Sequence, residues 1–176
     1  RVLFRSQKNY SLTLELYESK AEVAYLTGKF EEMETAIEQV LLQTKDTVDL
    51  LKVHDTKINA QMAQQQPLEA INTGRQFLKS LGIEIPESPQ AEDLKVEVAK
   101  ISQAMTGKKI ADLADLPLVE DRKQLAQIGI LSSLIPVCYQ GNPALFPWVV
   151  CRLMQLSIQY GNTSQSAFIY SCYGVI

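Results

Sequence analysis

The stretch YESKAEVAYLTGKFEEM at residues 17–33 decides the fold, because DTKINAQMAQQQPLEAI at residues 55–71 follows the same plan. In each stretch an apolar-periodic helix ends in a short turn, and an acidic residue then opens a second helix. A helical hairpin of this kind cannot bury its apolar face alone, so consecutive hairpins stack on one another. Stacked hairpins present extended surfaces that suit binding better than catalysis. The sequence therefore predicts an all-helical protein that interacts with other proteins.

The first predicted hairpin contains a helix over residues 9–26 and another over residues 30–44. In the first helix the large aliphatic residues fall at steps of three, four or seven residues, which predicts a buried stripe. This stripe consists of Leu12, Leu16, Val23 and Leu26, and the small residues Ala21 and Ala24 allow a neighbour to approach closely. Gly28 tolerates a positive φ at the turn. The second helix has its own predicted stripe, which consists of Phe30, Met33, Ile37, Val40 and Leu41.

The second predicted hairpin follows from two local signals. Asp46 stands where its carboxylate accepts from the free amides at the start of a third helix, which runs to about Gln64. Pro67 is compatible with the first turn of a helix but not with its interior, so it marks the start of a fourth helix. That helix ends near Leu81. Residues 9–82 are thus expected to form two hairpins.

Residues 83–119 are predicted to be a connector with one helix. The prolines at 86 and 89 favour extended backbone before them. Ser88 is the expected cap of the helix, with Pro89 in its first position. Its apolar stripe consists of Leu94, Val98, Ile101 and Met105, and Gly107 ends it. Leu113 and Leu116 are expected to hold the following loop against the helices.

Residues 120–176 are predicted to form buried helices, because Arg152 is the only charged residue after Lys123. No uninterrupted apolar run reaches the roughly 20 residues that cross a bilayer. One helix is expected to begin near Asn142 and Pro143, and a last one near residues 162–163. The last helix has no partner, so we expect the chain to be truncated there. Its exposed interaction edge would consist of Phe168, Tyr170, Tyr173, Val175 and Ile176.

Composition narrows the classes of partner and compartment. The net charge is −3, with 17 basic and 20 acidic residues, so the chain lacks the basic field that nucleic acids require. The cysteines Cys138, Cys151 and Cys172 are odd in number and widely spaced in an apolar region. This pattern favours buried reduced thiols and a cytoplasmic location over disulfides.

Motifs for catalysis are weak in this chain. His54 is the only histidine, which excludes a two-histidine metal site and favours a half-buried helix residue. Gly107-Lys108 lacks the earlier glycine, the following hydroxyl and the preceding strand of a phosphate loop. The acidic cluster Glu31, Glu32, Glu34 and Glu38 is typical of a solvated helix face. We therefore predict no catalytic, metal-binding or cofactor-binding residue.

The paired hairpins resemble tetratricopeptide repeats. Residues 16–31, 67–74, 130–133 and 160–174 resemble, more specifically, the long helical region of large bacterial signalling proteins, especially cyanobacterial ones. In that family a serine/threonine kinase and an ATPase-like domain precede this region, and a sensor domain and often a histidine kinase follow it. The resemblance implies a right-handed solenoid, irregular in the middle. ATP would then serve only the parent's other domains, since residues 1–176 contain no kinase signature.

These observations predict a non-catalytic segment for protein interaction and interdomain coupling, with no nucleic acid partner and no insertion into a membrane. Its partners would be the flanking domains of a signalling kinase and other proteins, and self-association through the C-terminal edge is a further expectation. A second hypothesis is a small-ligand sensor with a pocket between residues 146 and 173. A free-standing hydrolase or transferase is remote, because no nucleophile, base and orienting group come together in the sequence.

Overall fold

The computed structural model describes residues 7–176, and side chains from residue 9 onward. This part of the chain is built from α-helices and two short 3₁₀ helices. They are α1 (Gln7–Leu26), α2 (Phe30–Gln43), η1 (Thr47–Leu50), α3 (Leu51–Ala63), α4 (Pro67–Ser80), α5 (Ala91–Ala104), η2 (Ile110–Asp115), α6 (Arg122–Gly141), α7 (Phe146–Tyr160) and α8 (Ser166–Tyr173). Within it, the extended backbone pairs only at an isolated bridge between Leu118 and Asn162. The predicted all-α class is confirmed.

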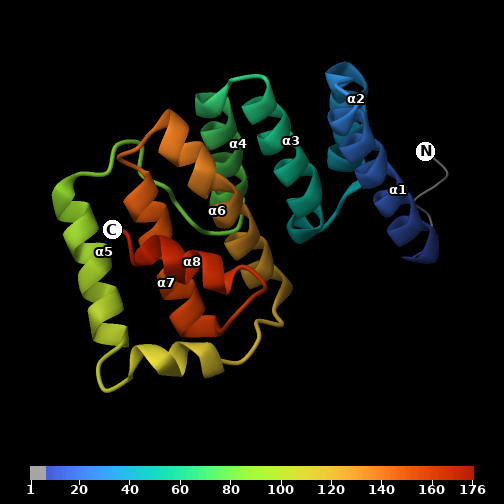
Figure 1. Ribbon diagram of the computed structural model, residues 1–176. Coiled ribbons are helices and arrows are strands. Elements are labelled where there is room, and N and C mark those ends of the chain that lie inside the picture. Colours follow the sequence, from blue (N-terminus) through green and yellow to red (C-terminus); the bar gives the residue numbers. More distant parts are fainter. Residues whose placement is uncertain (1–6) are drawn as a thin grey trace.

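The helices form a row of packed neighbours (Figure 1). α1 packs against α2 and α3, and α3 packs against α4. α6 then packs against both α3 and α4, and it leads to α7, which contacts α5 and α8. The α1–α2 pair lies at one end of the row and α5 at the other (Figure 1). The helix that packs on the α3–α4 pair is α6, although α5 comes next in the sequence. The tetratricopeptide-like solenoid stays a prediction.

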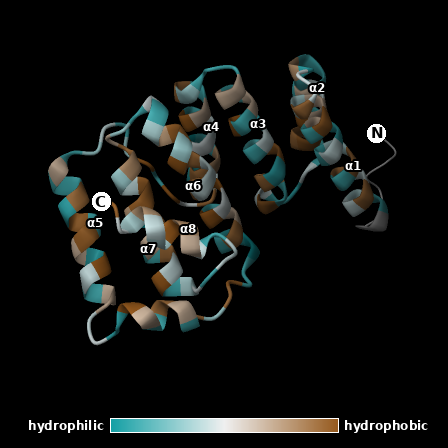
Figure 2. Ribbon diagram, in the orientation of Figure 1, coloured by the Kyte–Doolittle hydropathy of each residue, from teal (hydrophilic) through white to brown (hydrophobic). Residues whose placement is uncertain are grey.

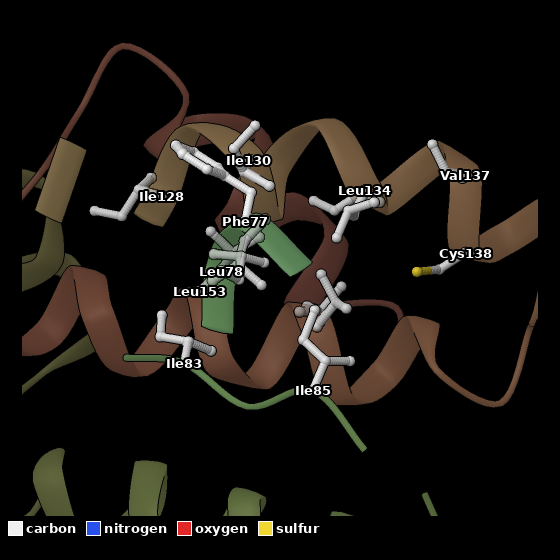
Figure 3. Close-up of a cluster of buried hydrophobic side chains, with 14 of the residues drawn as sticks. Phe77, Leu78, Ile83, Ile85, Ile128, Ile130, Leu134, Val137, Cys138 and Leu153 are labelled. Atoms are coloured by element: carbon white, nitrogen blue, oxygen red, sulfur yellow. The ribbon is translucent and has the colours of Figure 1, made fainter. Parts of the chain in front are cut away.

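The main core lies where α4, α6 and α7 meet. Figure 3 shows Phe77 and Leu78 of α4 beside Leu134 of α6 and Leu153 of α7, with Ile85 of the connector next to them. These residues are all buried, because α6 and α7 carry apolar residues on most of their circumference. Gly74 of α4 allows α4 and α6 to approach closely. A Cβ at this position would lie only 2.8 Å from the side chain of Leu134, which is too close for two carbon atoms.

Two smaller cores hold the ends of the row. Under the α1–α2 pair the buried residues are Ala21, Ala24, Met33, Ala36, Ile37, Val40, Val53 and Ala60. At the other end they are Ile101, Leu113, Cys151, Met154 and Ile158. Leu113 is buried and Leu116 packs beside it, so the leucines hold the loop against the helices as predicted.

Several predicted boundaries are confirmed and others are wrong. The side chain of Asp46 accepts from the amide of Val48, but the helix that it caps is the 3₁₀ helix η1, and α3 begins only at Leu51. α4 begins at Pro67, as predicted. α5 begins at Ala91 rather than at Pro89, because Asp93 accepts from the amide of Gln90 at 2.8 Å and fixes the cap there.

The last two helices begin later than predicted. α7 begins at Phe146, and α8 begins at Ser166. Asn162 cannot open a helix, because its amide donates to the carbonyl of Pro117 and its carbonyl accepts from the amide of Val119. Pro136 lies inside α6. None of the helices described is long and apolar enough for a bilayer crossing.

Candidate functional site

The most prominent apolar surface of the structure is the outer face of α1, which we define by Leu12, Leu16, Val23 and Leu26. Their exposed fractions are 57%, 61%, 58% and 71%. The sequence predicted these residues as a buried stripe, and that prediction is wrong. Hydrophobic colours recur along α1 between hydrophilic ones in Figure 2. The outer face is therefore an apolar stripe that no other described residue covers.

α1 is held through its opposite side. Ala21 and Ala24 are buried there against α2 and α3, and Tyr17 packs beside them. Thr13 is also buried, and its hydroxyl donates to the carbonyl of Asn9 at 2.6 Å. Small residues let α2 approach closely, so the helix uses its alanines for packing and leaves its leucines outside. Apolar periodicity correctly predicted that the four residues share one face of α1, but it did not predict that this face is exposed.

Polar contacts fix the orientation of the α1–α2 pair. Lys52 of α3 lies 3.2 Å from Glu22 of α1, and Lys57 lies 2.8 Å from Glu34 of α2. The Tyr10 hydroxyl donates to Asp49 at 2.8 Å, and burial is the largest cause that raises the Tyr10 pKa. Surface ion pairs of this kind each contribute about 0.2–1 kcal/mol, so they orient the pair more than they stabilise it.

Asp49 also connects this end of the row to the main core. Arg122, the first residue of α6, makes an ion pair with Asp49 and lies 3.4 Å from Asp46. The hydrogen bond from Arg122 to Asp49, followed by their opposite charges, raises the pKa of Arg122. α1, η1 and α6 therefore meet at one carboxylate, which couples the orientation of α1 to that of α6.

The predicted C-terminal edge divides into two sets. Phe168, Val175 and Ile176 are exposed, as expected of an interaction edge. Tyr170 and Tyr173 pack against the core between α5 and α7 instead, and the Tyr170 hydroxyl donates to Asn162 at 2.5 Å. Burial raises the pKa of both tyrosines. The first set is exposed, whereas the two tyrosines are half-buried.

A cavity of about 420 Å³ opens between the connector, α5 and α7. Its walls consist of Glu84, Ile85, Pro86, Asp93, Val96, Glu97 and Trp148. Glu97 is buried, and it accepts from Lys100 at 2.6 Å and from the Gln155 amide at 2.7 Å. No sequence pattern predicts this cavity, because tertiary packing brings the connector to α7.

The nucleophilic and titratable groups are placed for packing. His54 stacks on Phe77, and burial lowers its pKa. Burial raises the pKa of Cys138 to about 12 and that of Cys151 to about 11, so both thiols stay protonated and unreactive. No three His, Cys, Asp or Glu residues among those described are grouped so that they could hold a metal ion.

The sequence also missed a polar link across the α3–α6 interface. The Ser133 hydroxyl donates to Asp55, and both residues line an open cavity of about 240 Å³. The Ser133 hydroxyl also contacts the carbonyl of Gly129 in its own helix, so this pair links α3 to α6.

The outer face of α1 is thus the strongest candidate for function in the geometry. Compared with known protein families, curated proteins and solved structures, the chain shows no match in any of the three.

Proposed function

We propose that the chain is a non-catalytic segment for protein interaction and coupling, and that it binds an apolar helix through the outer face of α1. The observation that carries this proposal is the exposed row of Leu12, Leu16, Val23 and Leu26 on a helix at the end of the row. Burying the remaining exposed area of each residue contributes about 1 kcal/mol. Stripes of this spacing are what helical partners recognise.

The polar contacts around Asp49 explain how such binding would be transmitted. A shift of α1 on docking changes the positions of Tyr10 and Glu22, which contact η1 and α3. Asp49 passes that change to Arg122 at the start of α6. Packed helices switch between discrete arrangements rather than deforming continuously, so a change at one end biases the packing at the other.

The cellular context of this proposal rests on the sequence resemblance. In that context the segment lies in the cytoplasm, within a serine/threonine kinase that carries a two-component sensor. It would form part of a right-handed tetratricopeptide-like solenoid between the ATPase-like and sensor domains. ATP and phosphoryl transfer belong to those other domains, and the flanking domains are the proposed partners.

The test uses a kinase that carries this segment. Replacing Leu16 and Val23 with glutamate should leave basal phosphorylation intact and abolish its response to the sensor. Leu68→Glu is the matched control, because Leu68 is 60% exposed against 61% for Leu16 and lies on α4. An unchanged response in the Leu16 and Val23 variant would sink the proposal.

A second candidate function, sensing of a small organic cation, is favoured by the cavity at Trp148. Three carboxylates, those of Glu84, Asp93 and Glu97, line it beside the indole. An aromatic ring with nearby negative charge suits a cation of moderate size. Trp148 is the only tryptophan of the chain, so its fluorescence reports on the cavity directly. Titration with choline or arginine should change that emission saturably, and Glu84→Gln should weaken the change. A flat titration contradicts this candidate.

A further inference from the structure

The charged borders of the outer face of α1 determine which helix fits it. Glu15 and Glu22 lie along one border of the stripe, and Lys20 lies along the other, as the 3.6-residue period places them. Glu22 is already paired with Lys52. Glu15 and Lys20 are exposed, and neither makes an ion pair within the part of the chain whose side chains are described.

The stripe follows a seven-residue repeat. Leu12, Ser19 and Leu26 are seven residues apart, and Leu16 and Val23 form the second row between them. Residues so spaced occupy the two core positions of a paired helix. Glu15 directly precedes one core position, and Lys20 directly follows another. In two parallel helices in register, these two flanking positions, five residues apart, face each other across the seam.

From this pattern we infer that the occupant of the outer face is the α1 helix of a second copy of the chain, parallel and in register. This inference rests on the proposed function of that face. Glu15 of each copy meets Lys20 of the other, which gives two ion pairs related by the two-fold axis. An antiparallel second helix would instead place the glutamate borders against each other, and like charges in that position are unfavourable.

The fold leaves room for this arrangement. α2 and α3 contact α1 from the side of Ala21 and Ala24, away from the stripe. The α1–α2 pair lies at one end of the row of helices (Figure 1), which leaves few elements of the chain near α1. The seam covers about two heptads, which is short, and the dimer is therefore concentration-dependent.

Single-cysteine cross-linking tests register and direction. In a Cys172→Ser background, Leu26→Cys should form a covalent dimer on oxidation with copper phenanthroline, because residue 26 faces its own copy across a parallel seam. Ser11→Cys, exposed on the same helix but off the stripe, is the control and should stay monomeric. Cross-linking of Ser19→Cys without Leu26→Cys would indicate an antiparallel pair and would overturn the inference. The absence of cross-linking in both Leu26→Cys and Ser19→Cys would also overturn the inference.

Charge reversal tests the ion pairs without touching the apolar stripe. Glu15→Lys and Lys20→Glu should each weaken dimerisation about tenfold, because each turns two attractive contacts into repulsive ones. The double variant restores opposite charges and should regain the wild-type dimerisation constant within about threefold. A double variant as weak as the single ones would overturn the inference. The two proposals can fail separately. If the wild-type chain is monomeric and Leu16→Glu still abolishes the response of the kinase to its sensor, the dimer inference is wrong. The proposed function then stands, with a different helix bound to the outer face of α1.

Discussion

The imidazole of His54 stacks on the ring of Phe77, with centroids 4.2 Å apart and planes inclined by 15°. This contact joins α3 to α4 beside the main core. The Nδ1–H of His54 donates to the carbonyl of Leu50 at 2.9 Å, and Leu50 is the residue that directly precedes α3. Burial is the largest cause that lowers the pKa of His54, so the folded protein holds this ring neutral.

The first prediction concerns pH. In the unfolded chain His54 takes up a proton below about pH 6.5, whereas the folded state resists protonation. The stability that this residue contributes is present above pH 6.5 and falls as the pH drops from there towards the lower folded pKa. Denaturant unfolding at pH 7.5, 6.5 and 5.5 should show this loss for the wild type and a smaller loss for His54→Gln. Because the chain has no other histidine, the difference between the two proteins isolates this group. Parallel pH profiles would contradict the assignment.

The second prediction concerns the contact between the turn that follows α7 and the loop that precedes α6. Gly161 has φ of +119°, and a Cβ there would overlap the carbonyl oxygen of Pro117. That carbonyl accepts from the amide of Asn162 at 2.7 Å, so the overlap would also break the isolated bridge. Gly161→Ala should lower the free energy of unfolding by about 3 kcal/mol.

Gly107→Ala is the matched control for that variant. Gly107 also has a positive φ, +78°, but nothing lies within 4 Å of an added Cβ. Its cost should be only about 1 kcal/mol, from backbone strain alone. Equal losses for the two variants, measured by urea unfolding, would mean that the contact with Pro117 is unimportant.

The third prediction concerns thiol reactivity. Burial raises the pKa of all three thiols, but Cys138 and Cys151 are buried whereas Cys172 is half-buried near the end of α8. A thiol reagent such as iodoacetamide should label Cys172 in the folded protein and all three cysteines only after unfolding. Mass spectrometry of the labelled peptides measures this directly. Rapid labelling of Cys138 in the folded protein would contradict the packing of α6 against α4.

Local chemistry accounts for what the sequence predicts well. Pro67 and Asp46 mark helix starts through backbone geometry and capping, which depend on only a few neighbouring residues. The α1 stripe shows the limit of this approach, because α1 has apolar or small residues on two sides. Periodicity cannot decide whether the leucines or the alanines face the protein. The cavity at Trp148 was invisible for a different reason, since its walls come from three separate segments.

The C-terminal edge illustrates the same limit. Phe168 and Tyr170 are two residues apart on an apolar helix, yet Phe168 is exposed and Tyr170 is bonded to Asn162. The distinction depends on the loop around Pro117, which is distant in sequence. A pattern of aromatic residues therefore predicted the helix but not which of its residues a partner could reach.

The most direct test of the outer face of α1 is light scattering on the purified chain across a concentration series. The wild type should shift from monomer to dimer, while Leu16→Glu stays monomeric at every concentration. Val175→Glu, at a position 79% exposed beyond α8, should dimerise like the wild type. A dimer that Val175→Glu disperses and Leu16→Glu leaves intact would contradict the account and assign self-association to the C-terminal edge.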